Sequence, residues 1–83
     1  MIHTTKYSPA ITIIRPGVER LTAVNAKTFK NEMTALIDDG SAHLIVDFKD
    51  VTFLDSSGLG ALVGILKRVG NRGYLAVSGL RPD

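Results

Sequence analysis

Hydrophobic positions in the first half of the chain predict a helix. Phe29, Met33, Leu36 and Ile37 stand at i, i+4, i+7 and i+8, which places them on one helical face. Asn25 is a favoured N-cap residue, and Gly40 stands where a helix often ends with glycine. We therefore expect one helix between these two residues.

A second stretch with helical spacing follows the hexapeptide "DSSGLG" at residues 55–60. The residues expected on its apolar face are Leu59, Leu62, Val63, Leu66 and Val69. Lys67 and Arg68 are expected to point away from this face. The run 70–73, "GNRG", ends the predicted helix.

Four other segments have the composition of strands. "MIHTTKY" and "AITIIR" are separated by Ser8-Pro9, which predicts an antiparallel hairpin. "HLIVDF" contains an unbroken apolar run typical of a strand buried on both faces, and "YLAVS" is interpreted as another buried strand. The predicted order is β-β-α-β-α-β, a small α/β fold with a mixed sheet whose later strands pair in parallel.

Size and composition narrow the class of protein. The chain of 83 residues is expected to form one domain, residues 1–83, and it contains no cysteine, which excludes disulfides and thiolate chemistry. A net charge of +2 with scattered Lys and Arg disfavours a nucleic-acid partner. No apolar run approaches the roughly 20 residues of a membrane span, and the N-terminus lacks the pattern of a signal peptide. We expect a cytoplasmic protein.

The hexapeptide lies between a strand-like run, "VTFL", and the second helix, and its hydroxyls and carboxylate suggest chemistry. A nucleophile elbow would need a leading glycine, and the two histidines, His3 and His43, fall in other segments. "GLGALVG" shares glycines with dinucleotide-binding turns, but the acidic residue expected about 20 positions later is absent. The glycines are expected instead to let helix and sheet approach closely.

Carboxylates elsewhere do not suggest a metal centre. Asp38 and Asp39 are interpreted as solvated surface, and Asp47, Asp50 and Asp55 have no histidine among them. We therefore expect no cofactor, no metal and no enzymatic activity.

The remaining interpretation of the hexapeptide is a turn at a helix N-terminus. Asp55 or a serine caps the helix there, and a spare hydroxyl is available to a kinase. The spacing alone leaves Ser56 and Ser57 as alternatives.

The segment "DFKDVTFLDSSGLGALVGILKR" resembles the signature of the STAS domain, specifically of bacterial anti-sigma factor antagonists. "RLTAVNAKTFKNEMTALIDDG" resembles the loop and first helix of that family more loosely. In that family the first serine after the aspartate is phosphorylated by the cognate anti-sigma factor, a serine kinase. The resemblance therefore implies Ser56 as the phosphoacceptor.

The resemblance also implies a partner-binding surface and a partner switch. The implied contact residues are Asp55, Ser57, Gly58, Leu59, Gly60 and Thr22. Thr22 stands where many members of the family carry an acidic residue, which implies a difference in partner choice. The unmodified protein would bind the kinase, the phosphorylated form would release it, and a cognate serine phosphatase would reset the switch.

Two further expectations follow from the same resemblance. The family continues beyond this length with a helix, a strand and a last helix, so "GLRPD" is expected to be a turn that leads towards a missing helix in a C-terminally shortened domain. An uncovered sheet edge would favour a homo-oligomer.

The alternative function is a STAS-like module that holds a small ligand or serves as a scaffold in a transporter or signalling assembly.

Overall fold

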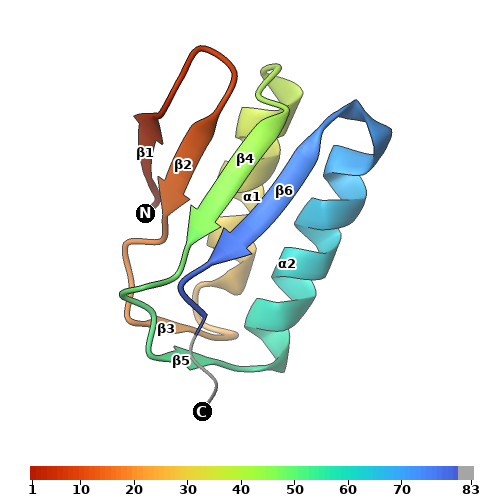
Figure 1. Ribbon diagram of the computed structural model, residues 1–83. Helices are drawn as coiled ribbons and strands as arrows, with labels where there is room; N and C mark the ends of the chain where they lie inside the picture. Colours follow the sequence, from red (N-terminus) through yellow and green to blue (C-terminus); the bar gives the residue numbers. More distant parts are fainter. Residues whose placement is uncertain (81–83) are drawn as a thin grey trace.

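A four-stranded sheet forms the centre of the computed structural model, which describes residues 1–80 (Figure 1). Its strands lie in the order β1-β2-β4-β6. Strand β1 pairs antiparallel with β2, whereas β2 with β4 and β4 with β6 are parallel. The predicted hairpin, the mixed sheet and the order of the main elements are confirmed. The strands span His3–Lys6 (β1), Thr12–Arg15 (β2), His43–Asp47 (β4) and Tyr74–Ser78 (β6).

A second sheet, of two strands with two residues each, lies below the main one; its second strand falls in the strand-like run "VTFL", whereas its first strand and their pairing were not predicted. It pairs β3 (Arg20–Leu21) in parallel with β5 (Phe53–Leu54). Two residues are too few to establish a period, so the pattern of apolar positions could not reveal the strand Arg20–Leu21. This small sheet brings together the two segments that lead into the helices, at one end of the molecule (Figure 1).

The first helix, α1, spans Ala26–Asp38. Its buried face carries Phe29, Met33 and Ile37, as predicted. The N–H groups of Gly40 and Ser41 donate to the carbonyls of Ile37 (3.1 Å) and Leu36 (3.1 Å), the paired bonds of a Schellman ending. Gly40 has a φ of 104°, which explains why glycine suits this position.

The second helix, α2, spans Ser56–Val69 and is followed by a short 3-10 turn, η1, at Gly70–Arg72. The prediction of one apolar face was only partly right. Leu62 and Val69 are buried together with Ala61 and Ile65, but three other apolar residues lie on a separate, exposed face: Leu59, Val63 and Leu66. Two neighbouring stripes of α2 therefore both have helical spacing, i, i+3, i+7 for Leu62, Ile65 and Val69 and i, i+4, i+7 for the exposed residues, and only the first packs into the core.

Both helices cover the same face of the sheet, so the strands are less buried than predicted (Figure 1). Leu44 and Val46 of β4 point into the core, whereas Ile45 is half-buried on the other face. Strand β6 lies at the sheet edge, and four of its five residues are exposed. The expectation of strands buried on both faces was wrong because no helix of residues 1–80 covers the second face.

The core lies between the sheet and the helices, where the rings of Phe29 and Phe48 pack at 6.4 Å between centroids. Among residues 1–80, no helix is long and apolar enough to cross a membrane. Gly79 and Leu80 follow β6, and the remainder of the predicted turn towards a further helix, residues 81–83, lies outside the described residues. Self-association through the β6 edge stays a prediction.

The buried and exposed stripes of α2 predict effects of different size for neighbouring substitutions. Ile65 is fully buried, so Ile65→Ala should lower the free energy of unfolding by about 2–5 kcal/mol. Leu66 is 54% exposed, so Leu66→Ala should change it by no more than about 0.5–1 kcal/mol. Urea unfolding followed by circular dichroism measures both, and equal losses would contradict the assignment of the two faces.

Candidate functional site

The turn between β5 and α2 is held by Asp55, which is the N-cap residue of the helix. One carboxylate oxygen, Oδ1, accepts a hydrogen bond from the backbone N–H of Gly58 at 2.9 Å. The residue itself has extended backbone angles, as N-cap residues usually do. Of the two capping candidates that the sequence allowed, the carboxylate rather than a serine caps the helix.

The second oxygen of Asp55 reaches another part of the chain. Oδ2 accepts a hydrogen bond from the backbone N–H of Ala23 at 3.1 Å, in the loop between β3 and α1. The backbone N–H of Asp55 donates to the carbonyl of Leu21 at 3.3 Å. One side chain therefore joins the starts of both helices.

The loop that receives this bond is itself ordered by side chains. Asn25 accepts from the N–H of Thr22 (3.0 Å) and donates through Nδ2 to the carbonyl of Arg20 (2.9 Å). Asn25 is the N-cap residue of α1, as predicted, but its side chain turns back into the loop instead of capping the helix. These two hydrogen bonds of Asn25 fix the loop so that the N–H of Ala23 is placed to donate to Asp55.

The surroundings of Asp55 favour its ionised form. The N–H of Gly58 above all, then those of Ala23 and Ser57 and the positive charge of Arg20, hold the pKa of Asp55 below its ordinary value of 3.8. Partial desolvation acts in the opposite direction but does not prevail. The turn therefore carries a fixed negative charge at neutral pH.

Because Asp55 caps the helix, the serine side chains of the turn are not needed to bind its N–H groups. Ser56 and Ser57 are exposed, and within residues 1–80 neither hydroxyl makes a hydrogen bond. They occupy the first two positions of α2, where backbone N–H groups have no partners within the helix. Both hydroxyls are sterically available to an approaching protein.

Gly58 and Gly60 have different roles in the turn. A Cβ at Gly58 would lie 2.6 Å from the carbonyl oxygen of Leu21 and 2.6 Å from Cδ1 of Leu54. Gly58 therefore permits the close contact of α2 with the small sheet, as the sequence predicted. A Cβ at Gly60 would meet nothing within 4 Å, so for this glycine the expectation of close approach was wrong.

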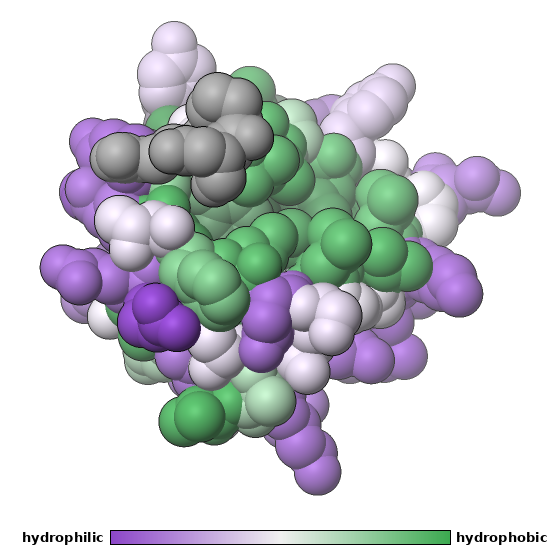
Figure 2. Space-filling view, turned by 90° about the horizontal axis from the view of Figure 1, so that it is seen from below, coloured by the Kyte–Doolittle hydropathy of each residue, from purple (hydrophilic) through white to green (hydrophobic). Residues whose placement is uncertain are grey.

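The end of the molecule that carries the turn has an apolar surface. Figure 2 views this end and shows apolar side chains gathered across its centre with polar ones around them. Exposed apolar side chains here come from the β3–α1 loop, from β5 and from the first turn of α2: Val24 (93% exposed), Phe53 (42%) and Leu59 (55%). The Arg20 guanidinium lies 4.2 Å from the centre of the Phe53 ring, a cation–π contact.

The structure brings together the residues that the sequence singled out. Asp55, Ser56, Ser57, Gly58, Leu59 and Gly60 form the turn and the first helical residues. Thr22 lies next to Ala23 in the loop that Asp55 binds, and its Oγ1 accepts from the N–H of Val24 at 3.3 Å. The partners missed were Ala23, which contributes only its backbone, and the Arg20–Phe53 pair, for which no local motif exists.

The other polar residues considered in the sequence analysis lie outside the serine turn or bind other groups. Asp47 accepts from the N–H of Lys49 at 2.9 Å, and Asp50 forms an ion pair with Arg15. His43 is exposed and begins β4, at the opposite end of the sheet from the turn (Figure 1). Among residues 1–80, no group of three or more His, Asp or Glu is placed to hold a metal ion.

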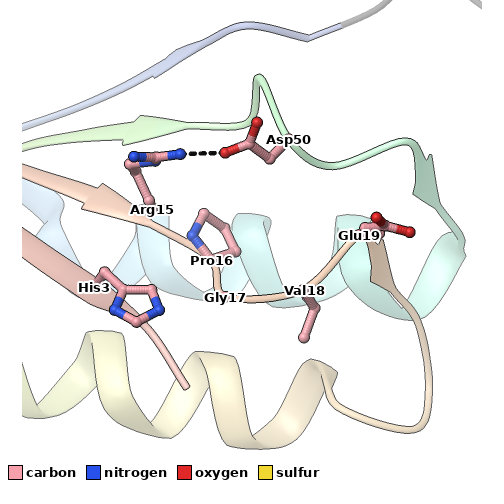
Figure 3. Close-up of a pocket in the computed structure, with 7 residues that line it drawn as sticks. All are labelled: His3, Arg15, Pro16, Gly17, Val18, Glu19 and Asp50. Carbon is pink, nitrogen blue, oxygen red and sulfur yellow. Dashed lines mark hydrogen bonds and ion pairs between the residues drawn. The ribbon is translucent and has the colours of Figure 1, made fainter.

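A hollow of about 490 Å³ lies where β1 begins and β2 ends. Its walls include His3 and the Arg15–Asp50 ion pair, and Figure 3 shows Glu19 at its far side, away from this pair. The ion pair neutralises the guanidinium, which removes the strongest anion-binding group of this hollow. Nothing in the wall therefore favours one class of small molecule.

Comparison with known proteins supplies the family. The family model of the STAS domain matches residues 4–83. The fold is similar to that of the anti-sigma factor antagonist SpoIIAA in its unphosphorylated form, with a TM-score of 0.79 and 19% identity. The similarity covers 99% of this chain and 76% of that one.

Two further structures are similar. SpoIIAA in its phosphorylated form, a Bacillus cell fate determinant, gives a TM-score of 0.75 at 18% identity, over 99% of this chain and 75% of that one. A proposed anti-sigma factor antagonist from Thermotoga maritima gives 0.76 at 28% identity, over 87% of this chain and 62% of that one. The chain thus spans less than two thirds of the Thermotoga protein.

The two glycines of the turn make a matched pair for measuring how tightly α2 packs on the small sheet. Gly58→Ala should lower the free energy of unfolding by about 1–3 kcal/mol, because its methyl group would overlap backbone and side-chain atoms. Gly60→Ala should raise it by up to about 1 kcal/mol, because alanine favours a helix and the position is open. Urea titrations test both, and a tolerated Gly58→Ala would refute the close contact.

The lowered pKa of Asp55 predicts part of the acid sensitivity. Because its pKa is lower in the folded than in the unfolded protein, its stabilising effect is complete above the ordinary pKa and is lost as the pH falls through the folded value. Asp55→Asn should be less stable at pH 7 and should lose less stability between pH 5 and pH 3. Asp39→Asn, which removes an exposed carboxylate without a bound N–H group, is the control and should keep the wild-type slope in urea titrations at each pH.

Proposed function

This chain belongs to the STAS-domain family, and from that premise we propose that it is an anti-sigma factor antagonist controlled by phosphorylation of Ser56. The observation that carries the proposal is the exposed Ser56 hydroxyl directly after a capping aspartate at the start of α2. The similarity to SpoIIAA, of which both unphosphorylated and phosphorylated forms are known, supports it. We propose further that residues 1–83 form a single STAS domain.

The unmodified turn suits a protein partner. Exposed apolar side chains, among them Val24, Phe53 and Leu59, gather at the same end of the molecule as the turn, with polar side chains around them (Figure 2). An apolar centre with a polar rim is the usual anatomy of a protein interface. We propose that an anti-sigma factor serine kinase docks here, with Asp55, Ser57, Gly58, Leu59, Gly60 and Thr22 among its contacts.

Phosphorylation would act through charge at a fixed position. A phosphate on Ser56 adds about −1.5 to −2 charges at pH 7. In the free protein the N-terminus of α2 partly offsets this charge, so the fold tolerates it. Inside an interface the phosphate must be desolvated beside the ionised Asp55, which is unfavourable. A loss of about 3 kcal/mol would weaken binding more than a hundredfold.

In this mechanism the protein is a substrate and a binding partner, not an enzyme. The turn supplies an acceptor hydroxyl but no general base, because Asp55 is committed to two backbone N–H groups. The kinase therefore brings the catalytic groups and ATP. A cognate serine phosphatase returns the protein to its binding form, and the cycle would take place in the cytoplasm.

The proposal predicts where phosphate is transferred. Incubation with anti-sigma factor serine kinases and ATP should add one phosphate, which peptide mass spectrometry should locate at Ser56. Ser56→Ala should remain unmodified, whereas Ser57→Ala should still acquire one phosphate. Phosphate on Ser57 alone would overturn the assignment of the acceptor.

Binding to the same kinase gives the second test. Isothermal titration should show that Ser56→Ala binds with the affinity of the unmodified protein and that Ser56→Asp binds at least about tenfold more weakly. Equal affinities of the two variants would contradict a charge-controlled switch.

A further inference from the structure

A groove runs between the two helices on the side away from the sheet. It consists of two hollows that share Lys30 as a wall. The smaller, about 190 Å³, begins at the serine turn and is lined by Ala26, Lys27, Lys30, Ser57, Gly60 and Ala61. The larger, about 450 Å³, continues towards the end of α2 and is lined by Lys30, Asn31, Thr34, Gly64, Lys67 and Arg68. We call this surface the interhelical groove.

The groove exists because α2 presents glycine to it. Gly60 faces open space, since a Cβ there would meet nothing within 4 Å. At Gly64 the missing side chain makes room for Lys30, because a Cβ at Gly64 would lie 2.8 Å from Cε and 2.9 Å from Nζ of that lysine. The side chain of Lys30, although exposed, therefore lies across Gly64 and places its ammonium group over the floor of the groove.

Positive charge in the groove is not neutralised. Within residues 1–80, Lys27, Lys30 and Lys67 form no ion pair or hydrogen bond through their ammonium groups. Arg68, at the far end, is bound by Asp38 through two bonds to Oδ1 and one to Oδ2. Three like charges are thus left along one groove, where an anionic ligand would reduce their mutual repulsion.

The shape of the charge distribution favours an extended ligand. From Ser57 to Arg68, α2 advances by about 16 Å at 1.5 Å per residue. About five residues of extended polypeptide span the same length. A single phosphate could contact only part of such a row of lysines, and the guanidinium fork that would suit it is already occupied by Asp38.

Features of a nucleic-acid site are missing from the groove. Its lining residues include no aromatic ring on which a base could stack. Asn31 and Thr34 instead offer polar groups along α1 that suit a polypeptide backbone. The lining of the groove therefore suits an acidic polypeptide better than a stacked nucleic-acid strand.

We propose that the interhelical groove binds an acidic polypeptide segment of the protein that docks on the serine turn. The groove starts at Ser57, so a partner bound at the turn can continue into it without a gap. This assignment of the partner rests on the proposed function, but the affinity of the groove for acidic polypeptide does not. Charge pairs on the rim of an interface act through electrostatic attraction, which mainly speeds association. Because salt screens this attraction, binding in the groove should weaken as the salt concentration increases.

A hexaglutamate peptide is a suitable probe. In a titration of the ¹⁵N-labelled protein at low salt, amide shifts should move along the facing sides of α1 and α2, and 0.5 M NaCl should abolish them. Lys27→Gln with Lys30→Gln should weaken binding on the order of tenfold. Lys6→Gln with Lys49→Gln, which removes the same charge outside the groove, is the control and should weaken it less than about twofold.

Several outcomes would overturn the proposal. These are shifts outside the groove, equal weakening by the control pair, or displacement of the peptide by an equal concentration of inorganic phosphate. Tighter binding of a thymidine hexanucleotide at the same residues would assign the groove to nucleic acid instead. If the kinase phosphorylates Ser56 but hexaglutamate does not bind, only the proposed role of the groove is refuted. If hexaglutamate binds in the groove but Ser56 is not phosphorylated, only the proposed switch is refuted.

Discussion

The two hydrogen bonds of the Asp55 carboxylate are the interaction on which the end of the molecule with the serine turn depends. Its two oxygens bind N–H groups that lie 35 positions apart in the sequence, at Ala23 and Gly58. Through this one side chain the β3–α1 loop and the β5–α2 turn become a single surface. The same bonds keep Asp55 ionised and leave both serine hydroxyls without a structural role.

The close contact beneath this surface is set by Gly58. With no side chain at this position, the first turn of α2 rests against the carbonyl of Leu21 and the side chain of Leu54. The small sheet of β3 and β5 is thereby held against the helix, and Phe53 and Leu59 remain exposed beside the serines. Exposed apolar side chains, exposed hydroxyls and a fixed charge are thus brought together from segments that are distant in sequence.

The arrangement of α2 explains how one short helix can serve several surfaces. Ala61, Leu62, Ile65 and Val69 pack on the sheet, whereas Gly60 and Gly64 face the interhelical groove. Leu59, Val63 and Leu66 form a third, exposed stripe. Because a helix turns by about 100° per residue, a sequence rich in Leu, Val and Gly can divide its apolar residues in more than one way. The periodicity alone therefore merged the first and third stripes into one.

Several features of this protein could be predicted from its sequence alone. They are the helix between Asn25 and Gly40, the N-terminal hairpin, the order of the main elements, and a capped helix start that carries two serines. These features depend on residues within a few positions of one another, so their pattern is visible along the chain. The tertiary structure decided the rest, since Ala23 contributes only an N–H group and Lys30 meets Gly64 across two helices. It also decided that the helices share one face of the sheet and leave β6 exposed, because the packing of distant elements has no period in the sequence.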